Sequence, residues 1–171
     1  MYNIVAAGFG EIFLKGKNRG KFEHKLIEQI NYNLKEFKDI SIYRDSGKVF
    51  IETKNEDDMD SIIEKTKKIF GIVTISPSVK TDKDPEVIIE KSIELFSYLK
   101  EKQDIRTFKV KTKRVDKSFP IKSMDFSAEV GGRILAAFSD LSVDVHNPDV
   151  EICIDIKKNC YISSEKIRTV G

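Results

Sequence analysis

Phe108-Lys-Val-Lys-Thr-Lys-Arg-Val-Asp-Lys-Ser-Phe-Pro120 is the stretch of this sequence with the clearest structural pattern. Its first half alternates apolar or neutral side chains with lysines. A period of two predicts a half-buried β-strand, because successive strand side chains point to opposite faces of a sheet. One face would be apolar, and the other would present the ammonium groups of Lys109, Lys111 and Lys113. A strand that displays a row of cations fits a polyanion better than a small neutral ligand; the alternative is a solvated strand face.

The basic character extends beyond this strand. Between Arg106 and Arg133 the chain holds eight Lys or Arg residues and three acidic residues, whereas the net charge of all 171 residues is only +2. This local surplus of positive charge favours nucleic acid as the partner. Seven cations are therefore candidate nucleic-acid contacts: Lys109, Lys111, Lys113, Arg114, Lys117, Lys122 and Arg133.

A second basic cluster, which contains Lys15, Lys17, Arg19, Lys21 and Lys25, lies near the N-terminus. Asn18 is a suitable N-cap for a helix, and cations at a helix N-terminus oppose the helix dipole unless an anion such as phosphate binds there. Lys15, Lys17 and Arg19 are therefore a second set of candidate contacts. The alternative is that Glu11 and Glu23 neutralise part of the cluster.

The composition indicates apolar cores and argues against a membrane protein. Hydrophobic residues make up 40% and charged residues 34% of the chain, and no apolar run approaches the ~20 residues needed to span a bilayer. Residues 1–8 lack a basic leader and are more typical of a first strand than of a secretory signal. We expect Cys153 and Cys160 to be ordinary strand thiols, because a zinc site needs more ligands. Free thiols predict a reducing compartment, the cytoplasm.

The first half of the chain predicts a ferredoxin-like order of elements. A buried strand at residues 3–9 precedes a helix at 18–37 whose apolar residues recur at helical spacing. Asp45-Ser-Gly47 is typical of a hairpin turn between strands at 40–43 and 49–51. An acidic helix at 56–68 and a strand at 72–75 complete the order βαββαβ, which is that of the ferredoxin-like unit.

The second half predicts another α+β module, separated from the first near residues 76–84. Asp84 and Pro85 begin a helix that extends to residue 100, and the basic strand follows at 107–113. A helix at 123–140 precedes strands at 150–156 and 160–162. This helix contains Gly131 and Gly132, which each cost about 1 kcal/mol relative to Ala. We expect close backbone packing, or the approach of a ligand, to compensate.

The sequence contains no recognisable catalytic or metal site. It has neither a Gly-x-x-x-x-Gly-Lys-Ser/Thr loop nor a Ser-Gly-Gly-x-Asp-Ser loop for nucleotide phosphates, and no nucleophile lies beside a base in sequence. His24 is expected to be solvated on a helix, and His146 to form a structural hydrogen bond in a turn. We therefore expect this chain to bind a ligand without catalysing a reaction and to need no cofactor of its own.

Several motifs resemble the tRNA 4-thiouridine synthetase (tRNA sulfurtransferase) family, which is also known for thiamine thiazole biosynthesis. Gly10-Glu-Ile-Phe-Leu-Lys-Gly-Lys-Asn-Arg19, followed by Phe22-Glu23, is similar to the opening signature of that family. The segment from Phe108 to Arg114, with Lys117, Phe119-Pro120, Ser123 and Val130-Gly131, resembles its THUMP domain. Val143-Asp-Val-His-Asn-Pro-Asp-Val150 is also similar to a segment of the family.

This resemblance implies an α+β fold with an N-terminal ferredoxin-like domain at residues 1–78 and an α/β THUMP RNA-binding domain at 79–171. It implies that an ATP-pyrophosphatase domain, with ATP and Mg²⁺, follows in the rest of the enzyme. The full enzyme would adenylate a uridine in tRNA and transfer sulfur from a persulfide that a cysteine desulfurase supplies. This chain would hold the tRNA acceptor stem and CCA end, and the family association implies a homodimer.

Three other interpretations stay open at this point. The THUMP pattern alone also fits other RNA-modifying enzymes, such as methyltransferases. Two ferredoxin-like units could instead form a regulatory domain for a small ligand, which predicts a compact polar pocket and no affinity for tRNA at moderate salt. A self-sufficient enzyme predicts turnover by this chain alone.

Overall fold

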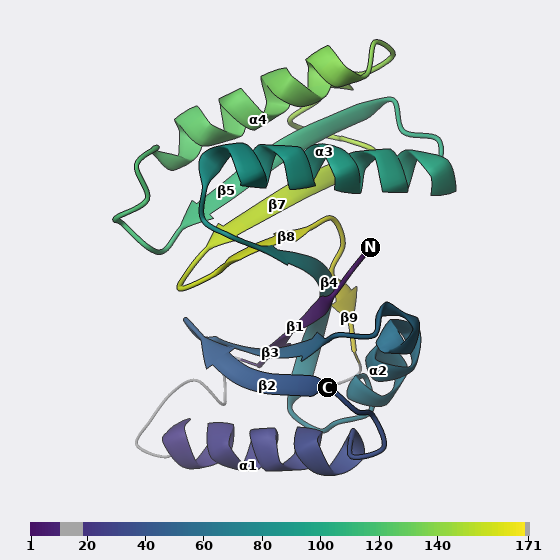
Figure 1. The fold of residues 1–171 in the computed structure, drawn as a ribbon, viewed down its shortest axis with the longest axis vertical. Coiled ribbons are helices and arrows are strands. Elements are labelled where there is room, and N and C mark those ends of the chain that lie inside the picture. Colours follow the sequence, from purple (N-terminus) through teal and green to yellow (C-terminus); the bar gives the residue numbers. More distant parts are fainter. Residues whose placement is uncertain (11–18, 170–171) are drawn as a thin grey trace. The chain divides into compact units, whose positions relative to one another are not determined.

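The chain forms two compact units, which Figure 1 shows as a computed structural model. The structure describes residues 1–10 and 19–169. The N-terminal unit comprises Tyr2–Ser78 together with the segment that begins at Lys166, and the C-terminal unit comprises Val79–Glu165.

The N-terminal unit contains an antiparallel sheet with the strand order β2-β3-β1-β4. Its elements are β1 (Ile4–Phe9), α1 (Arg19–Asn33), β2 (Ile40–Asp45), β3 (Lys48–Thr53), a 3-10 turn (Glu56–Asp58), α2 (Met59–Thr66) and β4 (Ile72–Thr81), whose last three residues belong to the other unit. The predicted order βαββαβ is confirmed. A short strand that the sequence does not predict, β9 (Ile167–Arg168), pairs with β4.

The core of this unit lies between one face of the sheet and the two helices. Val5 and Ala7 of β1, Leu26 and Ile30 of α1, and Ile62 of α2 are almost completely buried. The predicted hairpin is present, and its turn uses Ser46 and Gly47 at positive φ values of 45° and 87°. Two successive positive φ values are typical of the two-residue turns whose twist matches that of the flanking strands.

The C-terminal unit is a mixed sheet with the strand order β8-β7-β5-β6 and two helices on one face (Figure 1). Its elements are α3 (Pro85–Lys102), β5 (Thr107–Arg114), α4 (Ser123–Ala137), β6 (Ser142–Val143), β7 (Val150–Ile156) and β8 (Cys160–Ser163). Strand β5 runs parallel to β6 and β7, and β8 runs antiparallel to β7. The predicted α+β fold class is confirmed. The two-residue strand β6 is not predicted by any pattern.

Aromatic residues join the helices to the sheet in this unit. The ring centroids of Phe96 in α3 and Phe108 in β5 lie 5.3 Å apart in an edge-to-face arrangement, which adds to the stabilisation from burying both rings. Helix α3 begins as predicted, because the Asp84 carboxylate accepts hydrogen bonds from the amides of Glu86 and Val87. Helix α4 ends at Ala137, three residues before its predicted end.

Among the described residues, none of the helices is long and apolar enough to cross a membrane.

Candidate nucleic-acid interface

Strand β5 has the two different faces that the sequence predicts. Phe108 is completely buried under the helices, and the Thr112 hydroxyl forms a 2.8 Å hydrogen bond with the Ser127 hydroxyl of α4. The opposite face carries Lys109, Lys111 and Lys113, which we call the lysine face. Lys111 and Lys113 are exposed, and Lys109 is half-buried.

The neighbouring strand β7 places counter-charges beside part of the lysine face. Lys109 aligns with Glu151 in the parallel register, and its Nζ atom lies 3.1 Å from the Glu151 carboxylate. Burial alone would raise the pKa of Glu151, but hydrogen bonds from Lys109 and Cys153 outweigh it and lower that pKa. Lys109 is thus largely neutralised within the unit.

Lys111 and Lys113 differ from Lys109, since neither forms an ion pair with any residue in the described ranges 1–10 and 19–169. Lys111 aligns with Cys153 of β7, which carries no charge to balance it. Lys113 aligns with Asp155, but no ion pair joins the two side chains. These two ammonium groups are therefore available to an external anion.

The loop between β5 and α4, residues 115–122, is fixed by internal hydrogen bonds. The Arg114 guanidinium donates to the backbone carbonyl of Phe119 at 3.0 Å. Asp116 receives hydrogen bonds from Lys83 at 2.6 Å and from the amide and hydroxyl of Ser118. The Lys83 bond is the largest of the effects that hold the pKa of Asp116 far below its usual value. Arg114 and Lys83 thus shape the loop, an assignment that charge counting alone does not provide.

The other predicted contacts in this unit lie around the same loop and on α4. Lys117 and Lys122 are exposed. Arg133 is also exposed, but its Nη1 atom lies 3.1 Å from the Glu86 carboxylate in the first turn of α3. Cβ atoms added at Gly131 and Gly132 would meet nothing within 4 Å. Close packing within the described chain therefore does not require these glycines, and the approach of a ligand stays a prediction.

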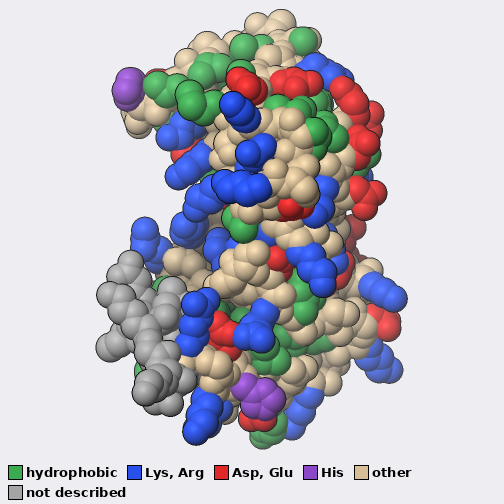
Figure 2. All heavy atoms as spheres, turned by 90° about the vertical axis from the view of Figure 1, so that its left-hand side faces the viewer, with side chains coloured by type: hydrophobic (Ala, Val, Ile, Leu, Met, Phe, Trp, Pro, Cys, Tyr) green, Lys and Arg blue, Asp and Glu red, His purple; other side chains and the backbone are tan. Residues whose placement is uncertain are grey.

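Figure 2 shows Lys and Arg side chains gathered on one face of the C-terminal unit.

No group of three or more His, Cys, Asp or Glu residues in the described part of the chain could hold a metal ion. Burial, followed by the nearby Glu151 carboxylate, raises the pKa of Cys153 to about 11. Burial also raises the pKa of Cys160 to about 12. Both shifts favour the neutral thiol at neutral pH, and a neutral thiol is a weaker nucleophile than a thiolate.

The second predicted set of contacts is described only in part. Lys15, Lys17 and Glu11 lie outside the described residues. Arg19 is the first residue of α1, and its Nε atom lies 3.1 Å from the Glu23 carboxylate, so neutralisation by Glu23 does occur at Arg19. Glu23 also binds Arg44 of β2. The sequence does not predict this contact, because the two residues are 21 positions apart and lie in different elements.

The two histidines occupy the positions expected of them. His24 is exposed on α1, with its Nε2 atom 3.1 Å from Glu28. The backbone amide of His146 donates to the Asp144 side chain, and both residues lie in the turn before β7.

Comparison with known proteins assigns a family to each unit. Residues 5–76 match the ThiI ferredoxin-like domain, and residues 82–165 match the THUMP domain. Over all 171 residues, the chain is 38% identical to a probable tRNA sulfurtransferase of Alkaliphilus metalliredigens and covers 43% of that protein. The chain therefore spans about two fifths of the length of this curated relative.

Two solved structures share the fold of the whole chain. One is the crystal structure of a 4-thiouridine synthetase in complex with RNA and with bound ATP; it has a TM-score of 0.86 and 30% identity, and the chain covers 43% of it. The other is PH1313 from Pyrococcus horikoshii, with a TM-score of 0.86 and 29% identity over 99% of this chain and 56% of that one.

Proposed function

The chain belongs to the tRNA sulfurtransferase family, and we propose that it is the part of such an enzyme that binds tRNA. The observation that carries this proposal is the pair of exposed lysines, Lys111 and Lys113, which no acid neutralises within the described chain. Membership of the family indicates that the partner is RNA, and the ammonium groups of the lysine face would bind the phosphates of that RNA.

The geometry of β5 suits an RNA backbone. Side chains two residues apart on one face of a strand are separated by ~7 Å, a distance comparable to that between successive phosphates of a nucleic-acid strand. A-form RNA is recognised largely through its shape, its phosphates and its 2′-hydroxyl groups. Two ammonium groups on a rigid strand can therefore bind neighbouring phosphates without selecting a base sequence.

The remaining predicted cations complete the proposed interface. Lys117 and Lys122 extend it along the loop that Arg114 and Asp116 fix. Lys109 and Arg133 contribute less free charge, because each is paired with a glutamate. We propose that this surface binds the acceptor stem and CCA end of tRNA, and that the N-terminal unit adds contacts through Arg19, Lys15 and Lys17.

The chemistry of the whole protein is also a proposal. We place ATP and Mg²⁺ outside this chain, whose sequence has no nucleotide-binding loop. The protein would adenylate a uridine of tRNA and receive sulfur from a cysteine desulfurase. A homodimer, a cytoplasmic location and sulfur supply to the thiamine thiazole are further parts of the proposal.

A binding experiment tests the central point. We expect the chain to bind tRNA in gel-shift assays at both low and moderate salt, with affinity falling as salt rises because phosphate contacts release counterions. An acceptor-end minihelix should bind, and the same minihelix without its CCA tail should bind more weakly. If tRNA does not bind at low salt, the proposal is wrong.

A further inference from the structure

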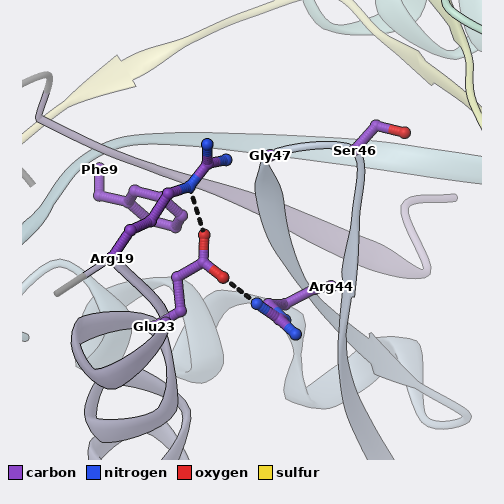
Figure 3. A pocket seen from close by; sticks show the side chains of 7 residues that line it. Phe9, Arg19, Glu23, Arg44, Ser46 and Gly47 are labelled. Atoms are coloured by element: carbon purple, nitrogen blue, oxygen red, sulfur yellow. Dashed lines mark hydrogen bonds and ion pairs between the residues drawn. The ribbon is translucent and has the colours of Figure 1, made fainter. Parts of the chain in front are cut away.

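A pocket of about 650 Å³ lies in the N-terminal unit, at the start of α1. Its walls are the end of β1, the first turns of α1 and the β2–β3 turn (Figure 3). The charged side chains that line it are Arg19, Glu23 and Arg44. Together they carry one net positive charge.

Glu23 is the centre of this group. Its side chain is only 6% exposed, and each of its two carboxylate oxygens accepts from a different guanidinium. The Arg19 Nε atom lies 3.1 Å from Oε1, and Arg44 Nη1 donates to Oε2. Burial would raise the pKa of Glu23, but hydrogen bonds from Arg44 and Arg19 outweigh it and lower that pKa. The carboxylate therefore stays ionised and fixes both arginines.

Within the described residues, both arginines keep most of their donors for another partner. A guanidinium has five N–H donors, and Glu23 is the only acid with which either arginine forms an ion pair in the described part of the chain. Their side chains are 49% and 56% exposed. Figure 3 shows the two terminal nitrogens of Arg19 pointing away from Glu23. One carboxylate thus orients two guanidinium groups that still face solvent.

We propose that this pocket is a preorganised phosphate subsite, in which Arg19 and Arg44 bind one phosphate group of the RNA and Glu23 holds them in position. The planar fork of a guanidinium matches the oxygens of a phosphate in a bidentate geometry. The start of α1 adds to this preference, since the first N–H groups of a helix have no partner within the helix. No acidic side chain lies in its first turn.

The subsite rests on the proposed function, and it adds two residues that charge counting in the sequence does not single out. Arg44 would be a second phosphate contact, supplied by a strand. Glu23 would be a positioning residue. Holding the arginines in advance reduces the side-chain entropy that RNA binding must otherwise overcome.

The first test replaces Arg44. We expect Arg44→Gln to weaken binding of tRNA severalfold and to reduce the slope of log K against log salt by about one. Arg44→Lys keeps the charge without the fork and should fall between Arg44→Gln and the wild type. The matched control is Lys54→Gln, because Lys54 is exposed and lies at the far end of β3, about 20 Å of strand from the turn.

The second test separates positioning from charge. Glu23→Gln keeps both cations and makes the pocket more positive by one charge, so diffuse electrostatics predicts tighter RNA binding. A glutamine replaces one acceptor oxygen by an NH2 group that can only donate, so it cannot offer a separate oxygen to each guanidinium. We therefore expect weaker binding with an unchanged salt slope and a cooperative melting transition. Tighter binding would overturn the positioning role of Glu23.

A third measurement does not depend on any variant. Titration of the wild-type chain with inorganic phosphate should shift the Nε–H NMR signals of Arg19 and Arg44, and the absence of a shift would overturn the subsite. The phosphate could be the 5′-terminal group of the RNA or a phosphate of its backbone. Minihelices with a 5′-phosphate or a 5′-hydroxyl distinguish these two sources. Weaker binding of the 5′-hydroxyl form identifies the terminal group, and equal binding identifies the backbone.

The outcomes also separate this proposal from the one on which it rests. If the chain binds tRNA and Arg44→Gln behaves like the Lys54→Gln control, the subsite is wrong and the RNA-binding function stands. If the chain does not bind tRNA at all, the proposed function fails, and the phosphate titration still decides whether the pocket binds phosphate.

Discussion

Replacing Lys111 and Lys113 together by glutamine should reduce the affinity for tRNA without unfolding the C-terminal unit. Both side chains are exposed and neither forms an ion pair in the described chain, so the change in unfolding free energy should stay within about 0.5 kcal/mol. Each lost contact between an exposed cation and a phosphate is worth about 1 kcal/mol. Two such contacts correspond to a roughly 30-fold higher Kd.

The assay is fluorescence anisotropy with labelled tRNA at several salt concentrations. The double variant should reduce the slope of log K against log salt by about 1.4 to 1.8, because each phosphate contact contributes roughly 0.7 to 0.9. The control is Lys91→Gln with Lys102→Gln, in which Lys91 is paired with Glu94 in the native unit. It removes the same charge from α3, which packs on the opposite face of the sheet. A wild-type slope in the β5 variant, or an equal loss in the α3 control, would refute the reasoning.

Three further predictions concern stability. Phe108→Ala should lower the free energy of unfolding by about 3 to 5 kcal/mol, because the ring is completely buried; urea denaturation measures this loss. Gly132→Ala should raise it by up to about 1 kcal/mol, since an added Cβ meets nothing within 4 Å, and a loss in the same assay would contradict that expectation. Burial would raise the pKa of Glu23, but hydrogen bonds from Arg44 and Arg19 lower it below its unfolded value. The stability that these bonds confer is therefore complete above about pH 4.3 and is lost as the pH falls through the folded pKa. The deficit of Glu23→Gln relative to the wild type should therefore shrink when denaturation at pH 7 is repeated at pH 3.

Local patterns in the sequence predict most of the fold, because they reflect local physics. The alternation in β5 follows from the pleat of a strand, the start of α3 from the Asp84 cap, and the β2–β3 turn from the tolerance of Gly47 for positive φ. The two-residue strands β6 and β9 have no such signal, since their pairing depends on tertiary neighbours.

The candidate site is only partly predictable for a related reason. The sequence shows where cations concentrate, but it does not show which of them are already paired. Lys109 and Arg133 find glutamates 42 and 47 positions away, so the strand register and helix packing decide their charge balance. Glu23 and Arg44 are likewise joined only by the fold. Among the predicted cations of the C-terminal unit, Lys111, Lys113, Lys117 and Lys122 remain exposed and without an ion pair to the described residues.

Lysine acylation with and without tRNA, read by mass spectrometry, tests most directly whether the lysine face binds RNA. The four lysines compared lie in the C-terminal unit: Lys111 and Lys113 on β5 are tested, and Lys91 and Lys102 on α3 are the references. Bound tRNA should protect Lys111 and Lys113 from acylation and leave Lys91 and Lys102 reactive. Equal reactivity of Lys111 and Lys113 in the presence and absence of bound tRNA would contradict the account.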